Sequence, residues 1–233
     1  MFDIISKTEY WDSLDIPNRP PILDQTKYDL KHIQDSWIYK EIGNVKNLKI
    51  LEVGGGNSRI LRCLDKSNEM WNLDEFVGAG LGPKTQIEIE GVKVVKENMG
   101  EFSSGLPDDY FDIVFSVSVL EHVPKPEQVV DFFKDSARVM KRNGRMLHAI
   151  DVYVWDEPHE ILQQRIDVYL RAVAASDLGY KSSPIIDRDL VFKCHFASNS
   201  DLGMYGWNKL APNLKERRRV TQSTSVKMEL TKE

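Results

Sequence analysis

Three consecutive glycines at residues 54–56 follow a short apolar run, and they constrain the fold more than any other feature of the chain. Residues 48–53 predict a buried strand, and residues 58–64 predict the beginning of a helix. Glycines between a strand and a helix let the backbone turn tightly and approach a ligand closely. The sequence therefore predicts a strand–turn–helix unit with a ligand at its turn.

The rest of the chain alternates between strand-like and helix-like patterns. Further strands are predicted at 68–74, 92–96, 111–120, 145–154, 189–197 and 224–230, and helices at 24–42, 124–140 and 159–177. Asp24 is the expected N-cap of the first helix, and Asn143-Gly144 the expected stop of the second. The run 111–120 is apolar on both faces, as a central parallel strand covered by helices must be. This alternation favours an α/β fold with right-handed crossovers.

Length and charge limit the partners. The 233 residues fit one globular unit, which we divide into an N-terminal helical arm or cap at 1–44 and a main domain at 45–233. A net charge of −5 argues against a general nucleic-acid binder. No apolar run reaches the ~18 residues of a membrane span, and the N-terminus is too charged for a signal peptide. We expect a monomer or homodimer without nucleic-acid or membrane partners.

The two cysteines indicate the compartment. Cys63 and Cys194 lie far apart in the sequence and lack the spacing of metal ligands. We interpret them as two thiols in a reducing environment, and we expect a cytoplasmic protein.

The residues around the glycines distinguish between ligands. In a dinucleotide site a third glycine would stand at the position that Arg59 occupies, so the chain fails that spacing. Glu52, just before the turn, suits a cationic ligand better than a pyrophosphate. S-adenosylmethionine, which carries a sulfonium and an ammonium group, is such a ligand.

An acid follows the turn at a characteristic distance. Asp74 lies twenty residues after Gly54 at the end of the strand predicted at 68–74, where a carboxylate can accept both ribose hydroxyls of an adenosine. A competing register would start that strand at Glu75 and put Gly80 in the place of the acid. We prefer Asp74, because the earlier segment supplies the strand residues and the spacing fits; the alternative is a surface turn residue.

With these residues identified, the chain resembles the class I S-adenosylmethionine-dependent methyltransferases, in particular the methyltransferase type 11 group, over about residues 45–155. Residues 106–123, LPDDYFDIVFSVSVLEHV, are similar to the group's fourth-strand signature, and 138–147, RVMKRNGRML, to its helix–turn–strand signature. The resemblance implies a Rossmann-like, seven-stranded, mostly parallel sheet flanked by helices, with the last strand antiparallel. It also implies an enzyme that transfers a methyl group from S-adenosylmethionine.

The resemblance further implies a set of cofactor-binding residues, namely Glu52, Gly54, Gly55, Gly56, Asp74, Asn98, Met99, Ser116 and Val117. The first four would surround the methionine end and Asp74 would hold the ribose. Asn98 and the Met99 backbone would lie near the adenine, and the carbonyls at the end of the fourth strand near the amino group. The chain departs from the group's pattern at Ser58, where glycine is common, and at Asn98, where aspartate is common.

Candidates for catalysis lie at the carboxyl ends of strands, where open α/β sheets bind ligands. Methyl transfer needs alignment of the acceptor, and a base only if the acceptor loses a proton. His122 can act as a neutral imidazole near pH 7; the alternative is a histidine that only packs against or hydrogen-bonds the adjoining loop. Asp151 is the second candidate. Strand alternation puts His148 on the face of Met146, so we expect a core histidine.

Other groups near these strand ends have weaker assignments. The acceptor-wall candidates are Tyr153, Trp155, His159 and Glu160, and an alternative, disfavoured interpretation makes a metal site of Asp151, Asp156, His159 and Glu160. We expect no metal. The aromatics Tyr10, Trp11, Trp37, Tyr205 and Trp207 form either a lid or ordinary packing. The segments 1–23 and 198–214 are expected to distinguish the acceptor.

The sequence thus predicts methylation of a small molecule, with a sugar or secondary-metabolite hydroxyl favoured. Two rivals remain at this stage. One is a catalytically silent protein that binds S-adenosylmethionine, and the other is an NAD(P)-dependent reductase on a similar fold.

Overall fold

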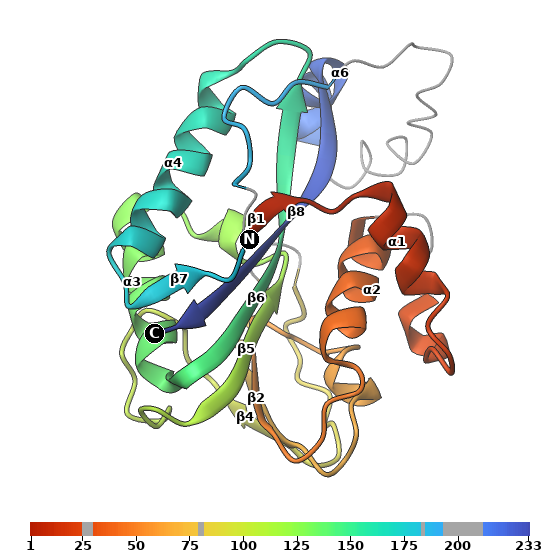
Figure 1. Ribbon diagram of the computed structural model, residues 1–233, viewed down its shortest axis with the longest axis vertical. Coiled ribbons are helices and arrows are strands. Elements are labelled where there is room, and N and C mark those ends of the chain that lie inside the picture. Colours follow the sequence, from red (N-terminus) through yellow and green to blue (C-terminus); the bar gives the residue numbers. More distant parts are fainter. Residues whose placement is uncertain (25–29, 79–81, 183–184, 193–211) are drawn as a thin grey trace.

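A twisted sheet runs through the middle of the protein, with helices on both of its faces (Figure 1). The computed structural model describes residues 1–24, 30–78, 82–182, 185–192 and 212–233. Within these residues the strands are β1 (Phe2–Ile4), β2 (Lys49–Val53), β3 (Glu69–Leu73), β4 (Val92–Val95), β5 (Phe111–Val117), β6 (Met140–Trp155), β7 (Leu178–Tyr180) and β8 (Thr221–Lys232). The helices are α1 (Lys7–Leu14), α2 (Leu30–Ile42), α3 (Pro126–Val139), α4 (Glu160–Ala174) and α6 (Lys215–Val220), joined by 3₁₀ turns η1 (Pro21–Asp24), η2 (Leu61–Cys63), η4 (Leu120–His122) and η6 (Pro212–Leu214).

The strand order is β1-β8-β6-β5-β2-β3-β4, and β7 also pairs with β8. Strands β4, β3, β2, β5 and β6 are parallel neighbours. β8 runs antiparallel to β6, and β1 and β7 run antiparallel to β8. The predicted α/β fold with a mostly parallel sheet and an antiparallel last strand is therefore confirmed, although the described residues form eight strands instead of seven.

Each face of the sheet carries its own apolar core. On one face α3 and α4 pack through Phe133 and Tyr169, which are fully buried. On the other face α2 packs through Trp37 and Ile38 against the sheet residue Phe115. β5 lies between the two cores, and this double burial explains why its sequence is apolar on both sides. Figure 1 shows α4 and α2 on opposite sides of the sheet.

The helix predicted at 58–64 is wrong. Only the single 3₁₀ turn η2 forms there, with a bond from the Cys63 N–H to the Ile60 carbonyl. Ser58 Oγ accepts from the Leu61 N–H at 2.9 Å, and Leu64 is already extended with ψ of 154°. A hydroxyl bound to a nearby backbone N–H competes with helical bonding in this way. The glycine turn therefore leads into a compact loop without a helix N-terminus.

Other predicted boundaries shift. Asp24 ends η1 and α2 is described from Leu30, while residues 25–29, part of the helix predicted at 24–42, lie outside the described residues. α3 ends at Val139, so Asn143-Gly144 lies inside β6 and does not stop a helix. The strand predicted at 189–197 is absent at 189–192, and its remainder is not described. Helix α1, in the arm, begins with a capping box between Ser6 and Glu9.

None of the helices in the described ranges is long and apolar enough to cross a membrane.

Candidate functional site

A cavity of about 740 Å³ opens where β2, β3, β4 and β5 reach their carboxyl ends. Open α/β sheets bind ligands at this edge. The glycine turn and the loops that follow β3, β4 and β5 form most of the wall, and α2 contributes Lys31 and Asp35. Every predicted cofactor-binding residue except Ser116 lines this cavity. Residues far apart in the sequence are thus brought to one site.

The glycine turn has a backbone that other residues adopt poorly. Gly54 and Gly56 have φ angles of 65° and 52°, in the left-handed region that disfavours a side chain. A Cβ on Gly54 would lie 2.5 Å from Cγ2 of Val119, and one on Gly55 would lie 2.6 Å from Cδ of Glu52. The turn therefore needs glycine both for its conformation and for the space it leaves.

Glu52 is a buried carboxyl group on the cavity wall. Its Oε2 has no hydrogen-bond partner among the described residues. Burial raises the pKa of Glu52 to about 8; a hydrogen bond from Ser58 opposes this rise, the carboxylate of Asp35 adds to it, and Arg59 and Lys31 oppose it. A buried acid without a partner is costly. A cationic ligand in the cavity would supply the missing partner.

An ion pair that sequence patterns did not indicate lies beside Glu52. Nε of Arg59 donates to Oδ2 of Asp35 at 2.6 Å, and the Asp35 side chain is almost fully buried. Nζ of Lys31 donates to the carbonyl of Val117 at 3.2 Å. The sequence does contain one feature that could have indicated a polar helix face here. Lys31, Gln34 and Asp35 are polar residues at spacings of three and four, which puts them on one face of a helix.

Asp74 follows β3 in the predicted register and faces the cavity. Its Oδ2 accepts from the Gly56 N–H at 2.8 Å, and its Oδ1 accepts from the Phe76 N–H at 2.7 Å. The competing register at 75–81 is wrong, because β3 stops at Leu73. Asp74 thus joins the second strand to the glycine turn, and each oxygen keeps a lone pair for a ligand hydroxyl.

The loop after β4 carries the residues expected near the adenine. Asn98 and Met99 line the cavity, and the Asn98 side-chain amide donates to Glu101 Oε1 at 3.2 Å. The neighbouring Glu97 also lines the cavity, and its buried Oε2 has no partner among the residues that the structure describes. An acid thus lines the cavity one residue before Asn98, and the motif spacing did not indicate it.

Ser116 points away from the cavity. Its hydroxyl bonds Nδ1 of His148 at 2.7 Å, and both side chains are fully buried. The His148 ring packs against Phe132 and Phe133, with centroid distances of 5.7 and 5.6 Å. Burial lowers the pKa of His148 to about 3. The prediction of a core histidine is therefore confirmed, and Ser116 can reach a cofactor only through its backbone.

The two predicted catalytic residues occupy different positions. His122 lines the cavity with 49% of its side chain exposed. Partial burial lowers the pKa of His122, and the Asp151 carboxylate opposes this shift. Asp151 does not line the cavity. Its Oδ1 accepts hydrogen bonds from Gln34 Nε2 at 2.5 Å and from the Ser118 hydroxyl at 3.1 Å. A neutral imidazole therefore faces the cavity, while the Asp151 carboxylate lies outside the cavity and acts on the ring only through its charge.

Glu121 is a third ionisable group here, and it was not among the candidates from sequence. Its Oε1 lies 4.0 Å from Nε2 of His122. Both carboxyl oxygens are buried without a hydrogen-bond partner in the described part of the chain. Burial raises the pKa of Glu121, and the nearby Asp151 raises it further. The end of β5 thus carries two acids and a histidine.

The expected acceptor wall is not part of this cavity. Trp155 is buried and stacks on His159 with a centroid distance of 4.0 Å, and His159 caps α4 by accepting from the Ile161 N–H. Neither these residues nor Tyr153 and Glu160 line the cavity. Trp155 and His159 instead hold the turn between β6 and α4. In the described ranges, no group of three or more His, Cys, Asp or Glu could hold a metal ion.

The aromatic residues expected as a lid also lie elsewhere. The Tyr10 hydroxyl bonds Nδ1 of His32 at 2.8 Å between α1 and α2, and Trp37 packs in the core. Trp11 is exposed, and none of the three lines the cavity. Tyr205 and Trp207 lie outside the described residues. Tyr10 and Trp37 therefore take part in ordinary packing and do not form a lid over the cavity.

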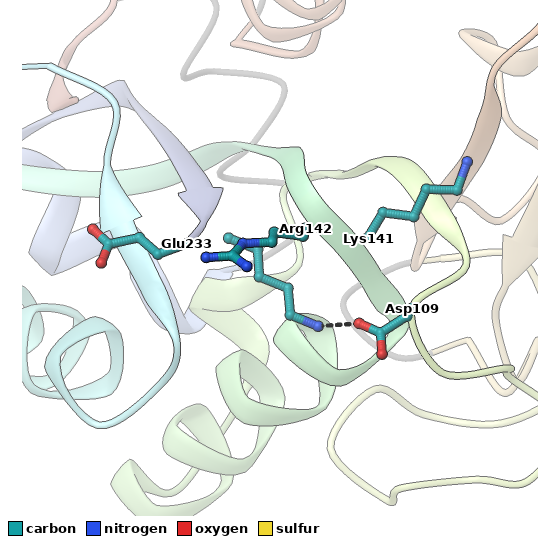
Figure 2. Close-up of a pocket in the computed structure, with 5 residues that line it drawn as sticks. Asp109, Lys141, Arg142 and Glu233 are labelled. Atoms are coloured by element: carbon teal, nitrogen blue, oxygen red, sulfur yellow. Dashed lines mark hydrogen bonds and ion pairs between the residues drawn. The ribbon is translucent and has the colours of Figure 1, made fainter.

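A shallower depression lies at the opposite edge of the sheet, between the beginning of β6 and the C-terminal end of β8 (Figure 2). Figure 2 shows Asp109, Arg142 and Glu233 around it, with an ion pair from Lys232 to Asp109. Lys141 points away and pairs with Asp112. Both lysines of this depression are already paired with acids, which leaves the larger cavity as the better candidate for the functional site.

Comparison with known proteins also points to the larger cavity as the functional site. Residues 51–148 match the family model Methyltransf_11, a methyltransferase domain. No curated protein sequence matches the chain significantly. Geranyl diphosphate C-methyltransferase from Streptomyces coelicolor A3(2), crystallised with Mg²⁺, geranyl diphosphate and S-adenosyl-L-homocysteine, has a TM-score of 0.55 at 13% identity, over 100% of this chain and 90% of that one.

Two further solved structures share the fold. The YcgJ protein from Bacillus subtilis has a TM-score of 0.54 at 14% identity, covering 87% of this chain and 99% of its own. The [4+2]-cyclase SpnF has a TM-score of 0.53 at 14% identity, covering 85% and 80%. At these identities the superpositions establish the fold.

The family match covers the glycine turn, Asp74 and the segment 111–123 that surround the cavity. Residues 51–148 are therefore similar to a methyltransferase domain, and this similarity favours a methyltransferase over the reductase alternative.

Proposed function

We propose that this chain is a class I methyltransferase that transfers the methyl group of S-adenosylmethionine to a hydroxyl group of a small molecule, such as a sugar or a secondary metabolite. The observation that carries the proposal is that Glu52 and His122 line one cavity. The first is a buried carboxyl group suited to a cationic cofactor, and the second is an imidazole suited to accept a proton.

The residues of the cavity fit the cofactor. The unpartnered Oε2 of Glu52 can accept a hydrogen bond from the ammonium group, and the Val117 carbonyl can accept another. The bare backbone of Gly54, Gly55 and Gly56 leaves room for the methionine end. We assign Asp74 to the ribose hydroxyls, and Asn98 and the Met99 backbone to the adenine. Ser116 would contribute only its carbonyl.

The chemistry divides between the cofactor and the protein. S-adenosylmethionine supplies an electrophilic methyl group. The protein has to hold the acceptor oxygen in line with it, and to take up the proton that the hydroxyl loses. We assign proton uptake to His122, which faces the cavity, and electrostatic support to Asp151, whose charge favours a protonated imidazole. The products are the methyl ether, S-adenosylhomocysteine and one proton.

Size and charge support a small acceptor. The cavity of about 740 Å³ is within the range of small-molecule sites, roughly 300–1,000 Å³. The net charge of −5 disfavours a nucleic-acid substrate. We further propose a cytoplasmic monomer or homodimer, in line with the free thiol of Cys63.

A transfer assay tests the proposed function. The protein is incubated with S-adenosylmethionine labelled on the methyl group and a panel of sugars, phenols and aliphatic alcohols, with amines and carboxylic acids as a comparison set. We expect label in an ether product together with an equal amount of S-adenosylhomocysteine. Label only in the amine or acid products would overturn the assignment of a hydroxyl acceptor.

A second candidate is a protein that binds the cofactor without transferring its methyl group. Both Asp74 oxygens already accept backbone hydrogen bonds, and a cyclase shares this fold. This candidate predicts that the protein binds S-adenosylmethionine and releases no S-adenosylhomocysteine with any acceptor in the panel.

A further inference from the structure

We propose that Glu121 is a positioning residue for His122: its carboxylate fixes the imidazole in the Nε2–H tautomer, so that Nδ1 accepts the proton of the acceptor. This inference rests on the proposed function, because it assigns a partner to the group that takes up the proton there. No sequence motif assigns a role to Glu121, and a methyl transfer that needs no base would not require it.

The first observation is the geometry of η4. Its two consecutive residues Glu121 and His122 bring Oε1 and Nε2 to 4.0 Å from each other. The His122 side chain is 49% exposed toward the cavity, whereas that of Glu121 is only 13% exposed. The carboxyl group therefore lies behind the imidazole and out of the cavity. Because Nε2 faces Glu121, Nδ1 is the ring nitrogen left for a ligand.

The second observation is that no side chain of the described residues donates a hydrogen bond to the Glu121 carboxyl group. Both of its oxygens are buried, and only the backbone N–H groups of Glu121 and Asp151 lie close enough to favour its charged form. The backbone around it is held in place, since fully buried Leu120 anchors the turn and Nη2 of Arg165 donates to the Glu121 carbonyl at 3.4 Å. A buried carboxyl group without a side-chain donor is costly to ionise, and a donor on the neighbouring imidazole would offset that cost.

Charged or titratable groups face Glu121 from each of the three elements packed around it. Asp151 faces it from β6, Lys31 from α2, and Arg165 and Tyr169 from α4. Asp151 disfavours a second negative charge and Lys31 favours it, while burial is the larger effect and raises the pKa of Glu121 to about 8. Burial and Asp151 thus both favour the protonated form of Glu121, and its carboxylate forms only above the pH range usual for a glutamate.

The proton transfer balances with this arrangement. The acceptor O–H bond breaks and an O–CH₃ bond forms as the S–CH₃ bond of the cofactor breaks. The proton moves to Nδ1 of His122, and the Glu121 carboxylate compensates the positive charge on the ring. The imidazolium then releases its proton to solvent through the cavity. An ionised Glu121 is required, so transfer should accelerate as the pH rises toward about 8.

Nitrogen NMR of the histidine rings tests the proposal in the full chain saturated with S-adenosylhomocysteine. His122→Gln identifies the His122 signals. We expect that the wild-type His122 ring shifts change near pH 8 and that above this pH they report the Nε2–H tautomer. In Glu121→Gln this change should vanish. In the control Glu157→Gln, which alters an exposed glutamate outside the cavity, it should persist.

Wild-type rings that show no change near pH 8, or a Glu121→Gln protein that retains it, would overturn the proposal. The wild-type spectra alone decide the question if the variant does not fold. With an acceptor from the transfer assay, Glu121→Gln should lower kcat by about 10- to 100-fold with little change in KM, and flatten its rise with pH. Failure of the proposed function would give a different result from failure of the Glu121 proposal. The wild type would then transfer no methyl group to a hydroxyl, while its NMR spectra could still show the expected change in the His122 ring.

Discussion

At the scale of single residues, we expect cofactor binding to depend most on Glu52. It is buried, it faces the cavity, and its Oε2 has no hydrogen-bond partner in the described residues. Such a group destabilises the protein alone and stabilises a complex with a cation. The same side chain should therefore have opposite effects on folding and on binding.

Replacing the carboxylate tests this opposition. Glu52→Gln should weaken S-adenosylmethionine binding by about 10- to 100-fold, because a charge-assisted hydrogen bond contributes roughly 1.5–3 kcal/mol. The free energy of unfolding of the cofactor-free variant should be unchanged or higher. Calorimetry and denaturant unfolding measure the two effects, with Glu157→Gln as the control. Equal affinity in Glu52→Gln and wild type would contradict the role assigned to Glu52.

The pH dependence of stability follows from the same residue. The folded-state pKa of about 8 lies above the ordinary value of 4.5, so the stability from keeping Glu52 protonated is present below 4.5 and is lost as the pH rises through 8. The free energy of unfolding of the cofactor-free protein should fall by several kcal/mol over this range. Denaturant titrations at several pH values should show a smaller fall in Glu52→Gln. Parallel pH profiles of the two proteins would exclude this explanation.

At the scale of elements, the glycine turn needs an unusual backbone conformation at a position where a side chain would also crowd the cavity wall. Gly54 combines a φ of 65° with a close approach to Val119, whereas Gly91 has a φ of 80° and no atom within 4 Å of the position that a Cβ would take. The two positions therefore separate backbone strain from steric crowding.

Alanine substitution at both glycines measures these contributions. Gly91→Ala should cost about 1–2 kcal/mol, the strain of a left-handed residue with a side chain. Gly54→Ala should cost roughly 1–3 kcal/mol more, because the added Cβ overpacks against Val119, and it should also weaken cofactor binding. Denaturant unfolding and calorimetry provide the comparison. If both substitutions cost the same and leave binding intact, the close approach of Val119 has no role in the site.

The sequence predicts some elements well for local reasons. β5 is recognisable because its residues face two cores, and Asp74 because a strand of known length separates it from the glycine turn. The segment after the turn was predicted wrongly, because the apolar Ile60 and Leu61 suggest a helix, whereas Ser58 binds the Leu61 N–H and closes a 3₁₀ turn. A single side-chain hydrogen bond decides between a helix and a 3₁₀ turn, and the hydrophobic periodicity of the sequence does not reveal that bond.

At the scale of the whole molecule, the features that could not be predicted from the sequence depend on distant segments. β1 and β7 are short strands that exist because β8 offers them a partner. Asp35 meets Arg59 only after α2 has packed on the sheet. Glu121 was overlooked because only burial makes its carboxyl group unusual. The cofactor end of the cavity was thus largely predictable, while the acceptor end depends on how η4, α2 and α4 come together.

The central claim is that this cavity binds S-adenosylmethionine through the glycine turn and the acid that follows it. Calorimetric titration of the purified protein with S-adenosylmethionine, S-adenosylhomocysteine and NADH, repeated on Asp74→Ala, tests it most directly. The account predicts micromolar binding of the first two ligands, no binding of NADH, and loss of binding in the variant. Binding of NADH alone, or binding of S-adenosylmethionine that Asp74→Ala leaves intact, would contradict it.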